Sequence, residues 1–246
     1  MPKREPKVSP ASGLDVLHLL DLSFRDYEGA RCLLLNDLLF PGAQLASLAV
    51  EKYAKLVLAI SGATSKFHLD DLSQAKKVCD DQGVPVLNEM DPQFLSLLSA
   101  AFRLRYYDAD TGPEPFGFFK WQLLGELDAT VARIEGQIEI NGDGKGVLSP
   151  YARAAFERRR TVWWENHVLN GWAKPAFMER AGPFLFRMFM PNGREMLKQL
   201  DQKPVPYQGA MVILTNLEIV DAPDAVRVAF EEPYKASFAR GAQPPG

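Results

Sequence analysis

The chain has 246 residues, of which 47% are apolar and 24% are charged, and its 28 Lys and Arg against 31 Asp and Glu give a net charge of −3. This composition is typical of a soluble globular protein and excludes a uniformly basic nucleic-acid-binding chain. Apolar runs extend over a few residues only, far short of the roughly 20 that span a bilayer, so we expect no membrane partner. Two cysteines without metal-ligand spacing favour a cytoplasmic location, and with three histidines we expect neither a metal site nor a cofactor.

The first 60 residues predict a leader and two helices. Residues 1–12 hold three prolines and little that can be buried, which predicts a disordered leader. Apolar residues recur every three or four positions over 14–39, the pattern of a long helix. The Pro-Gly pair at 41–42 predicts a break, followed by a nearly all-apolar helix over 43–60. Because only a narrow arc of this helix is polar, other helices must cover it, which indicates a bundle.

Three further helices are expected before residue 141. Acidic residues in the first turn and a glycine stop predict a helix over 69–83. Asp91 followed by Pro92 predicts the cap and first residue of the next helix. A last helix is expected over about 116–140. Together these segments predict an antiparallel four- or five-helix bundle over 13–140.

The pattern changes after this bundle. Three glycines in 141–146 predict a linker, and Ser149 followed by proline predicts a short helix to about residue 160. A β-branched stretch at 209–220 predicts a strand, and a closing helix is expected over 224–240. The fold class is therefore mainly α, with a smaller C-terminal α+β extension over 147–246.

Four stretches in the bundle lie in the order and spacing of a known family. They are QLASLAVEKYAK at 44–55, Gly62, HLDDL at 68–72 and RYYD at 105–108. The chain thereby resembles the HEPN (higher eukaryotes and prokaryotes nucleotide-binding) domain, whose members have an AxxxAEKxxKA-type second helix, an HxL or HDL motif opening the third, and an RYPD or Arg-x(4–6)-His element ending the fourth. The resemblance covers about residues 14–140. It implies a two-fold paired helical bundle that cleaves RNA or binds RNA or a nucleotide, often in toxin–antitoxin or phage-defence systems.

Among the residues that carry this resemblance, Arg105 is the one whose chemical role follows most directly from its position. It falls in phase with the buried face of its helix, where an arginine needs a carboxylate, phosphate or carbonyl partner. No histidine occurs in the six residues after it, so the sequence departs from the nuclease pattern. Arg105 is expected either to bind a phosphate across a dimer seam or to form a structural ion pair with Glu51 or Asp108.

The other candidates in the bundle also have two interpretations. His68 either caps the third helix or contacts the ligand. Glu51 and Lys55 form either a solvated i,i+4 ion pair or part of a polar site. Lys52 either extends its amine to solvent or contacts the ligand. The predicted ligand-binding set is Arg105, Lys52, Lys55, Glu51, Tyr106 and Asp108.

The C-terminal part contains a second candidate site. Over 149–200 there are nine Lys and Arg against four Asp and Glu, a local charge of +5 that the acidic remainder conceals. Arg160 and His167 have Arg-x(6)-His spacing in this basic region. Trp163, Trp164 and Trp172 lie among the arginines, a combination typical of single-stranded RNA binding, where bases stack on aromatic rings. The alternatives are a coincidental spacing and tryptophans that form a core.

The sequence therefore leaves three functions open. We expect a HEPN-like homodimer that binds RNA or a nucleotide without nuclease activity. The first alternative is an active, metal-independent ribonuclease of the toxin or defence type, which would use Arg105 with His68, or Arg160 with His167. The second is a non-catalytic interaction module that docks a nucleotidyltransferase or another partner.

Overall fold

The structure, a computed structural model, describes residues 13–60, 77, 81, 90–103, 116–138, 140–142, 145–189 and 195–202. The predicted leader, the strand at 209–220 and the helix at 224–240 lie outside these residues, as does nearly all of the helix predicted over 69–83. The described part is mainly helical, which confirms the fold class at that level. Among its helices, none combines the length and the apolar character needed to cross a membrane.

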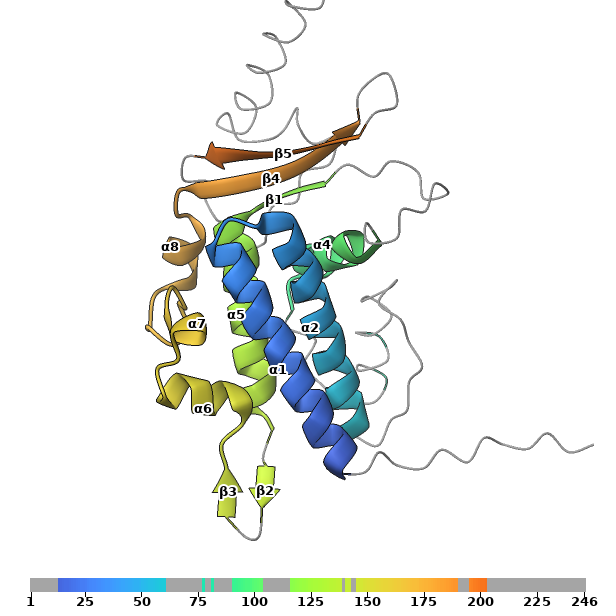
Figure 1. Cartoon of the computed structure of the whole chain (residues 1–246), viewed down its shortest axis with the longest axis vertical. Helices are drawn as coiled ribbons and strands as arrows, with labels where there is room; N and C mark the ends of the chain where they lie inside the picture. The colour runs from blue at the N-terminus through green and yellow to red at the C-terminus, as the bar shows by residue number, and fades with distance from the viewer. Residues whose placement is uncertain are drawn as a thin grey trace, which may run out of the picture.

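Three long helices form the body of the molecule (Figure 1). α1 (Gly13–Leu35) and α2 (Leu39–Ile60) lie side by side in opposite directions, and α5 (Lys120–Gly136) packs against both. α4 (Pro92–Arg103) packs on α2. Burial of apolar side chains between these helices is the main source of stability. The core includes Leu20, Tyr27, Leu34, Val50, Tyr53, Leu98, Leu127 and Val131.

The boundary between the first two helices differs from the prediction. The sequence predicts a break at 41–42, but α2 begins at Leu39 and includes both residues. A proline in the first turn of a helix lacks only an N–H group that would have no partner there, so the pair does not interrupt α2. The chain reverses just before it, at Asp37, which has a φ of 61°. Aspartate is one of the few residues that tolerate this left-handed conformation.

Two predicted helix starts are confirmed. Asp91 Oδ1 accepts hydrogen bonds of 2.7 and 3.2 Å from two backbone N–H groups in the first turn of α4. Ser149 Oγ accepts a bond of 3.3 Å from the backbone N–H of Ala152, at the start of α6 (Pro150–Phe156). The helix predicted to continue to residue 160 ends at Phe156, because the chain turns at Arg158 with a φ of 50°.

A three-stranded antiparallel sheet lies at one end of the helices (Figure 1). Its order is β1 (Phe116–Phe119), β4 (Gly182–Phe189) and β5 (Glu195–Gln202). The prediction that 116–119 begins a helix is therefore wrong, since helix α5 starts at Lys120. The run FGFF is rich in residues that favour strands, and Phe118 pairs with Leu185 of β4.

A short hairpin projects from the opposite end of the helices (Figure 1). Its strands are β2 (Ile140–Gly142) and β3 (Lys145–Val147), which pair antiparallel. Of the predicted linker at 141–146, the described residues 141–142 and 145–146 thus lie in two paired strands. A glycine-rich sequence is typical of both a linker and a hairpin, because glycine supplies the backbone freedom that a tight turn needs.

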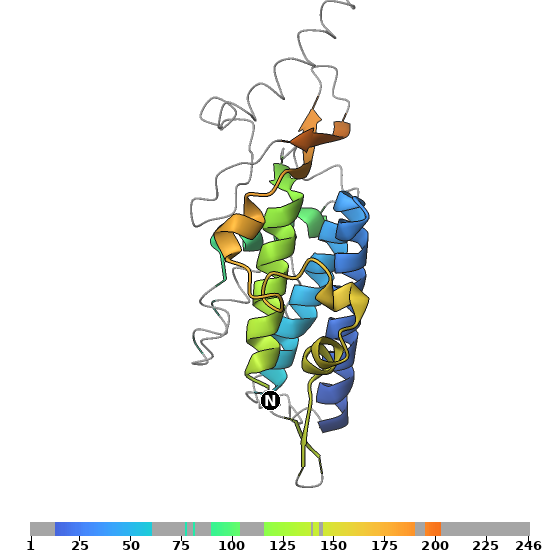
Figure 2. The ribbon, with the colours of Figure 1, turned by 90° about the vertical axis from the view of Figure 1, so that its left-hand side faces the viewer.

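Three short helices cover one side of the long ones (Figure 2). α6 and α7 (Arg160–Trp163) pack on α1, and α6 and α8 (Lys174–Met178) pack on α5. Their buried residues Tyr151, Val162 and Phe177 belong to the same apolar core as α1, α2 and α5. Residues 150–178 are therefore held against the long helices by shared packing.

Candidate functional site

Part of the predicted site cannot be placed. His68, Arg105, Tyr106 and Asp108 lie outside the described residues. The proposed phosphate contact of Arg105 and its alternative ion pairs therefore stay predictions.

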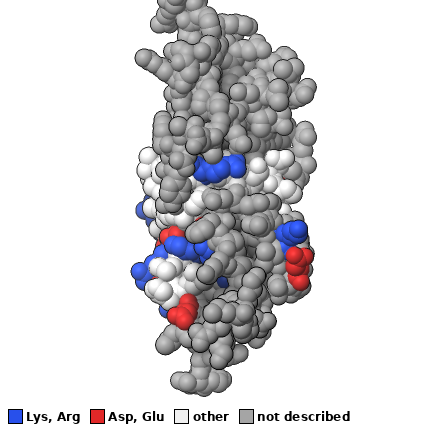
Figure 3. All heavy atoms as spheres, turned by 90° about the vertical axis from the view of Figure 1, so that its right-hand side faces the viewer, with Lys and Arg blue, Asp and Glu red and all other residues white. Residues whose placement is uncertain are grey.

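The three site residues predicted on α2 form ion pairs within the chain. Lys55 pairs with Glu51 one turn earlier, and Lys52 pairs with Asp26 of α1. Glu51 is nearly buried while both lysines keep about a third of their surface exposed. On the face of the molecule shown in Figure 3, basic and acidic side chains of the described residues lie next to each other. The i,i+4 pair predicted between Glu51 and Lys55 is confirmed, though it is less solvated than expected.

The strongest polar cluster lies elsewhere, between α1 and α5. Arg31 and Asp128 form an ion pair in which both side chains have no exposed surface. Tyr27 donates a hydrogen bond of 2.9 Å to the same carboxylate, and Asn166 donates one of 3.3 Å to the Tyr27 hydroxyl. Burial alone would lower the pKa of Arg31, but the adjacent Asp128 carboxylate raises it overall, so the guanidinium carries its charge.

This buried arginine also holds the segment that follows α6. Arg31 Nε donates a hydrogen bond of 2.9 Å to the carbonyl of Thr161, and Nη2 donates one of 2.6 Å to the carbonyl of Trp164. Both acceptors lie on α7 or at its end. Arg159 adds a contact of 3.3 Å to Glu28 of α1. The position of this single helical turn is thus set by polar groups of α1.

The residues after α7 are fixed in a similar way. Asn166 Oδ1 accepts two backbone N–H groups at 3.1 Å, and Asn170 Nδ2 donates to the carbonyl of Trp163 at 2.9 Å. Glu165 has a φ of 52°, a left-handed conformation that costs a non-glycine residue about 1–2 kcal/mol. Strained residues persist where surrounding contacts over-determine them, and they often mark functional sites.

A second buried polar cluster joins α2, α5 and α6. The Tyr53 hydroxyl and the backbone N–H of Tyr151 both donate hydrogen bonds to the carboxylate of Glu135. Burial raises the pKa of Glu135, although these hydrogen bonds act in the opposite direction. Burial and the neighbouring Glu135 also raise the pKa of Tyr53 well above its ordinary value. The cluster fixes α6 on α5 and faces the interior, so its role is structural.

The predicted pair of Arg160 and His167 occupies two different environments. Arg160 is exposed, and its guanidinium carbon lies 5.4 Å from the ring centroid of Trp164. His167 is 5% exposed and packs on Phe177, with Nε2 3.0 Å from the carbonyl oxygen of Gly125, to which it donates as the Nε2–H tautomer. These contacts place His167 in the buried interface between α5 and α8.

One surface of the described residues combines exposed arginines with aromatic rings. We call residues 153–164 the Arg/Trp segment. Arg158 lies over the ring of Trp163 at 5.2 Å and Arg160 over that of Trp164, so two arginines stack on two neighbouring indoles. Trp164 is 49% exposed, and Phe156 at the end of α6 is 82% exposed. Trp164 is therefore not a core residue. The alternative interpretation, that the tryptophans form a core, does not hold for this one.

No family model, curated protein or solved structure matches this chain. The HEPN resemblance accordingly stays a prediction based on the motifs at 44–108. Among the described residues, no group of three or more His, Cys, Asp or Glu side chains is placed to hold a metal ion.

Arg31 and Asp128 were not among the predicted site residues, although their positions in the sequence carried a signal. Arg31 falls in the apolar stripe of α1, four residues after Tyr27 and three before Leu34, both fully buried. Asp128 lies in the same way between Leu124 and Val131 on α5. The reasoning applied to Arg105, that a charge in an apolar stripe needs a buried partner, would have selected both residues.

Proposed function

We propose that this protein is a HEPN-like homodimer that binds single-stranded RNA through the Arg/Trp segment without cleaving it. The observation that carries the proposal is the exposed stacking of Arg158 and Arg160 on Trp163 and Trp164. RNA-binding surfaces that read single strands combine guanidinium groups, which contact phosphates, with aromatic rings, on which bases stack. The local charge of +5 over 149–200 supports an anionic partner.

The second support is the set of polar contacts that hold the segment on α1. Arg31 bonds to backbone carbonyls on α7 and at its end, and Glu28, also on α1, pairs with Arg159 just before α7. A surface that is ordered before binding loses less conformational entropy when a ligand arrives. The buried Arg31–Asp128 pair therefore supports binding at the Arg/Trp segment, although neither residue reaches the surface.

The test is equilibrium binding of a fluorescently labelled single-stranded RNA of about 20 nucleotides, followed by anisotropy at several salt concentrations. We expect affinity to fall steeply with salt, because each phosphate contact to a single strand contributes about 0.7 to the slope of log K against log salt. Arg158→Ala with Arg160→Ala should weaken binding and reduce that slope by about 1.4. Trp164→Ala should weaken binding about 5- to 160-fold, the effect of losing one stacked base.

The matched control removes the same two charges on α2. Lys52→Ala with Lys55→Ala should leave the affinity and the salt slope nearly unchanged. If the lysine variant loses binding and the arginine variant retains it, the site lies on α2, where the sequence motif at 44–55 predicts it. If the wild-type chain does not bind RNA at low salt, the proposal is wrong and the interaction module remains.

Two further measurements test the other parts of the proposal. Labelled RNA should stay intact on a denaturing gel after long incubation, and light scattering coupled to size exclusion should give the mass of a dimer. Cleavage, or growth arrest on expression that Arg105→Ala relieves, would instead support the ribonuclease. Relief only by His167→Ala would place the catalytic site at the C-terminal pair.

A further inference from the structure

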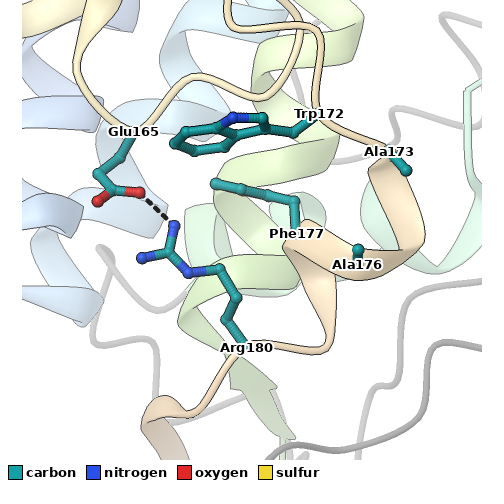
Figure 4. A pocket seen from close by; sticks show the side chains of 6 residues that line it. All are labelled: Glu165, Trp172, Ala173, Ala176, Phe177 and Arg180. Carbon is teal, nitrogen blue, oxygen red and sulfur yellow. Dashed lines mark hydrogen bonds and ion pairs between the residues drawn. The ribbon is translucent and has the colours of Figure 1, made fainter.

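A pocket of about 400 Å³ opens beside the Arg/Trp segment. Figure 4 shows it between α8 and the turn that follows α7, with the rings of Trp172 and Phe177 lying nearly parallel. Trp172 is 45% exposed, whereas Phe177 is buried and forms the floor. Its volume is within the range of small-molecule sites, about 300–1,000 Å³. Its lining residues are Glu165, Trp172, Ala173, Ala176, Phe177 and Arg180.

Two charged groups are fixed at one side of this pocket. Glu165 and Arg180 form an ion pair, and the guanidinium carbon of Arg180 lies 4.0 Å from the ring centroid of Trp121. The indole of Trp121 is itself held by a hydrogen bond of 2.8 Å from Nε1 to the carbonyl of Ala181. Gly182 leaves room for that ring, because a Cβ there would come within 2.4 Å of Nε1. A carboxylate and a guanidinium are thus presented together beside an exposed indole.

This arrangement matches the hydrogen-bonding edge of one nucleobase. Guanine carries an acceptor, O6, next to two donors, N1–H and the N2 amino group, on its Watson–Crick edge. A carboxylate accepts both donors side by side, and a guanidinium donates to O6. Adenine, cytosine and uracil each lack the two adjacent donors that a carboxylate needs. An aromatic face is the usual partner of an unpaired base, and Trp172 provides one.

We infer that the pocket binds a guanine base of an RNA strand whose phosphates lie on the Arg/Trp segment. The inference rests on the proposed function and adds base specificity to it. The base stacks on Trp172 with its Watson–Crick edge toward Glu165 and Arg180. Glu165 follows Trp164 directly in the chain, so one short strand can reach both the arginines and the pocket.

The experiment compares GMP, AMP, CMP and UMP by isothermal titration calorimetry, followed by labelled oligonucleotides with a single guanine in a uridine background. We expect GMP to bind at least about fivefold more tightly than the other three, the discrimination of a bidentate base contact. The single guanine should increase RNA affinity by a similar factor. Equal binding of all four nucleotides, or no gain from the guanine, would overturn the inference.

Three variants test whether the preference for guanine arises in this pocket. Glu165→Gln keeps the shape of the side chain but replaces one acceptor with a donor, so it should abolish the preference for guanine. Ala176→Leu adds bulk at an exposed position in the pocket and should do the same without disturbing the interior. Leu17→Ala removes an apolar side chain of α1 that has the same exposed fraction as Trp172 but lies outside the pocket, and it should leave GMP binding unchanged. A guanine preference that survives both pocket variants would refute the site, and thermal melting of each variant checks that it is folded.

The outcomes separate this inference from the proposed function. RNA binding that depends on Arg158 and Arg160 without any base preference supports the proposed function and contradicts the guanine pocket. Binding of GMP that Glu165→Gln abolishes, in a chain that does not bind RNA, supports the pocket and contradicts the proposed function.

Discussion

Replacing Arg31 with methionine should destabilise the protein more than any surface charge substitution. Methionine is of similar length and fits an apolar environment, but it leaves the carboxylate of Asp128 buried without its cation. Removing one partner of a buried ion pair costs about 3–5 kcal/mol, because the remaining charge is neither hydrated nor compensated. The carbonyls of Thr161 and Trp164 also lose a donor, at about 1 kcal/mol each.

The expected total of about 5–7 kcal/mol is a large share of the 5–15 kcal/mol that stabilise most domains. In a chain of this size, 1 kcal/mol corresponds to about 2–4 °C in Tm, so Tm should fall by roughly 10 °C or more. Urea unfolding followed by far-ultraviolet circular dichroism gives the free energy directly. Tryptophan fluorescence should change as well, because the carbonyl of Trp164 is held by Arg31.

Two controls test whether the loss of stability comes from the buried ion pair. Arg25, which pairs with Asp21 on the surface of α1, should tolerate methionine with a loss of about 0–1 kcal/mol. The double variant Arg31→Met with Asp128→Leu should be more stable than the sum of the two single variants implies, since it removes both charges. If Arg31→Met costs no more than Arg25→Met, or if the two single effects simply add, the buried pair does not hold the fold.

Three other substitutions test the packing and the second polar cluster. Burial raises the pKa of Glu135, so its contribution to stability is fully present below the unfolded-state pKa of about 4.3 and is lost as pH rises through the folded-state pKa. The unfolding free energy of wild type relative to Glu135→Gln should therefore fall as pH rises above about 4.3 in urea titrations, and a constant difference would contradict this. Tyr53 has a raised pKa, so stability should decline above pH about 10 and decline less in Tyr53→Phe, which alkaline unfolding curves measure. Gly182→Ala should cost about 1–3 kcal/mol, because the new Cβ meets Trp121, and an unchanged Tm would show that the ring can shift.

Local chemistry made parts of the fold predictable from the sequence. The caps at Asp91 and Ser149 were predictable because each depends on a hydrogen bond within one turn. The apolar character of residues 43–60 correctly indicated a helix covered by neighbours, since most of α2 is buried. The start of α2 was misplaced because a proline in a first turn resembles a proline that ends a helix.

Long-range pairing could not be predicted from local patterns. β1 is stabilised by β4, whose residues lie far along the chain, and FGFF alone also fits the apolar face of a helix. Within the candidate site, the tryptophans and Arg160 were found from composition, while Glu165 and Arg180 were not. Their significance depends on an ion pair across 15 positions and on the ring of Trp121, which belongs to α5.

In the proposed function, the exposed arginines contact RNA and the buried Arg31 stabilises the segment that carries them. Arg31 cannot contact a ligand, but its hydrogen bonds to Thr161 and Trp164 place the turn that carries Arg160 and the exposed indole. A variant that weakens this support should therefore reduce RNA affinity even where the surface charges are intact. Asp128→Asn is suited to show this, because asparagine keeps the acceptor for Tyr27 while it removes the charge that compensates Arg31. A loss of affinity in this variant, at a temperature where it remains folded, would connect the core pair to the surface that it supports.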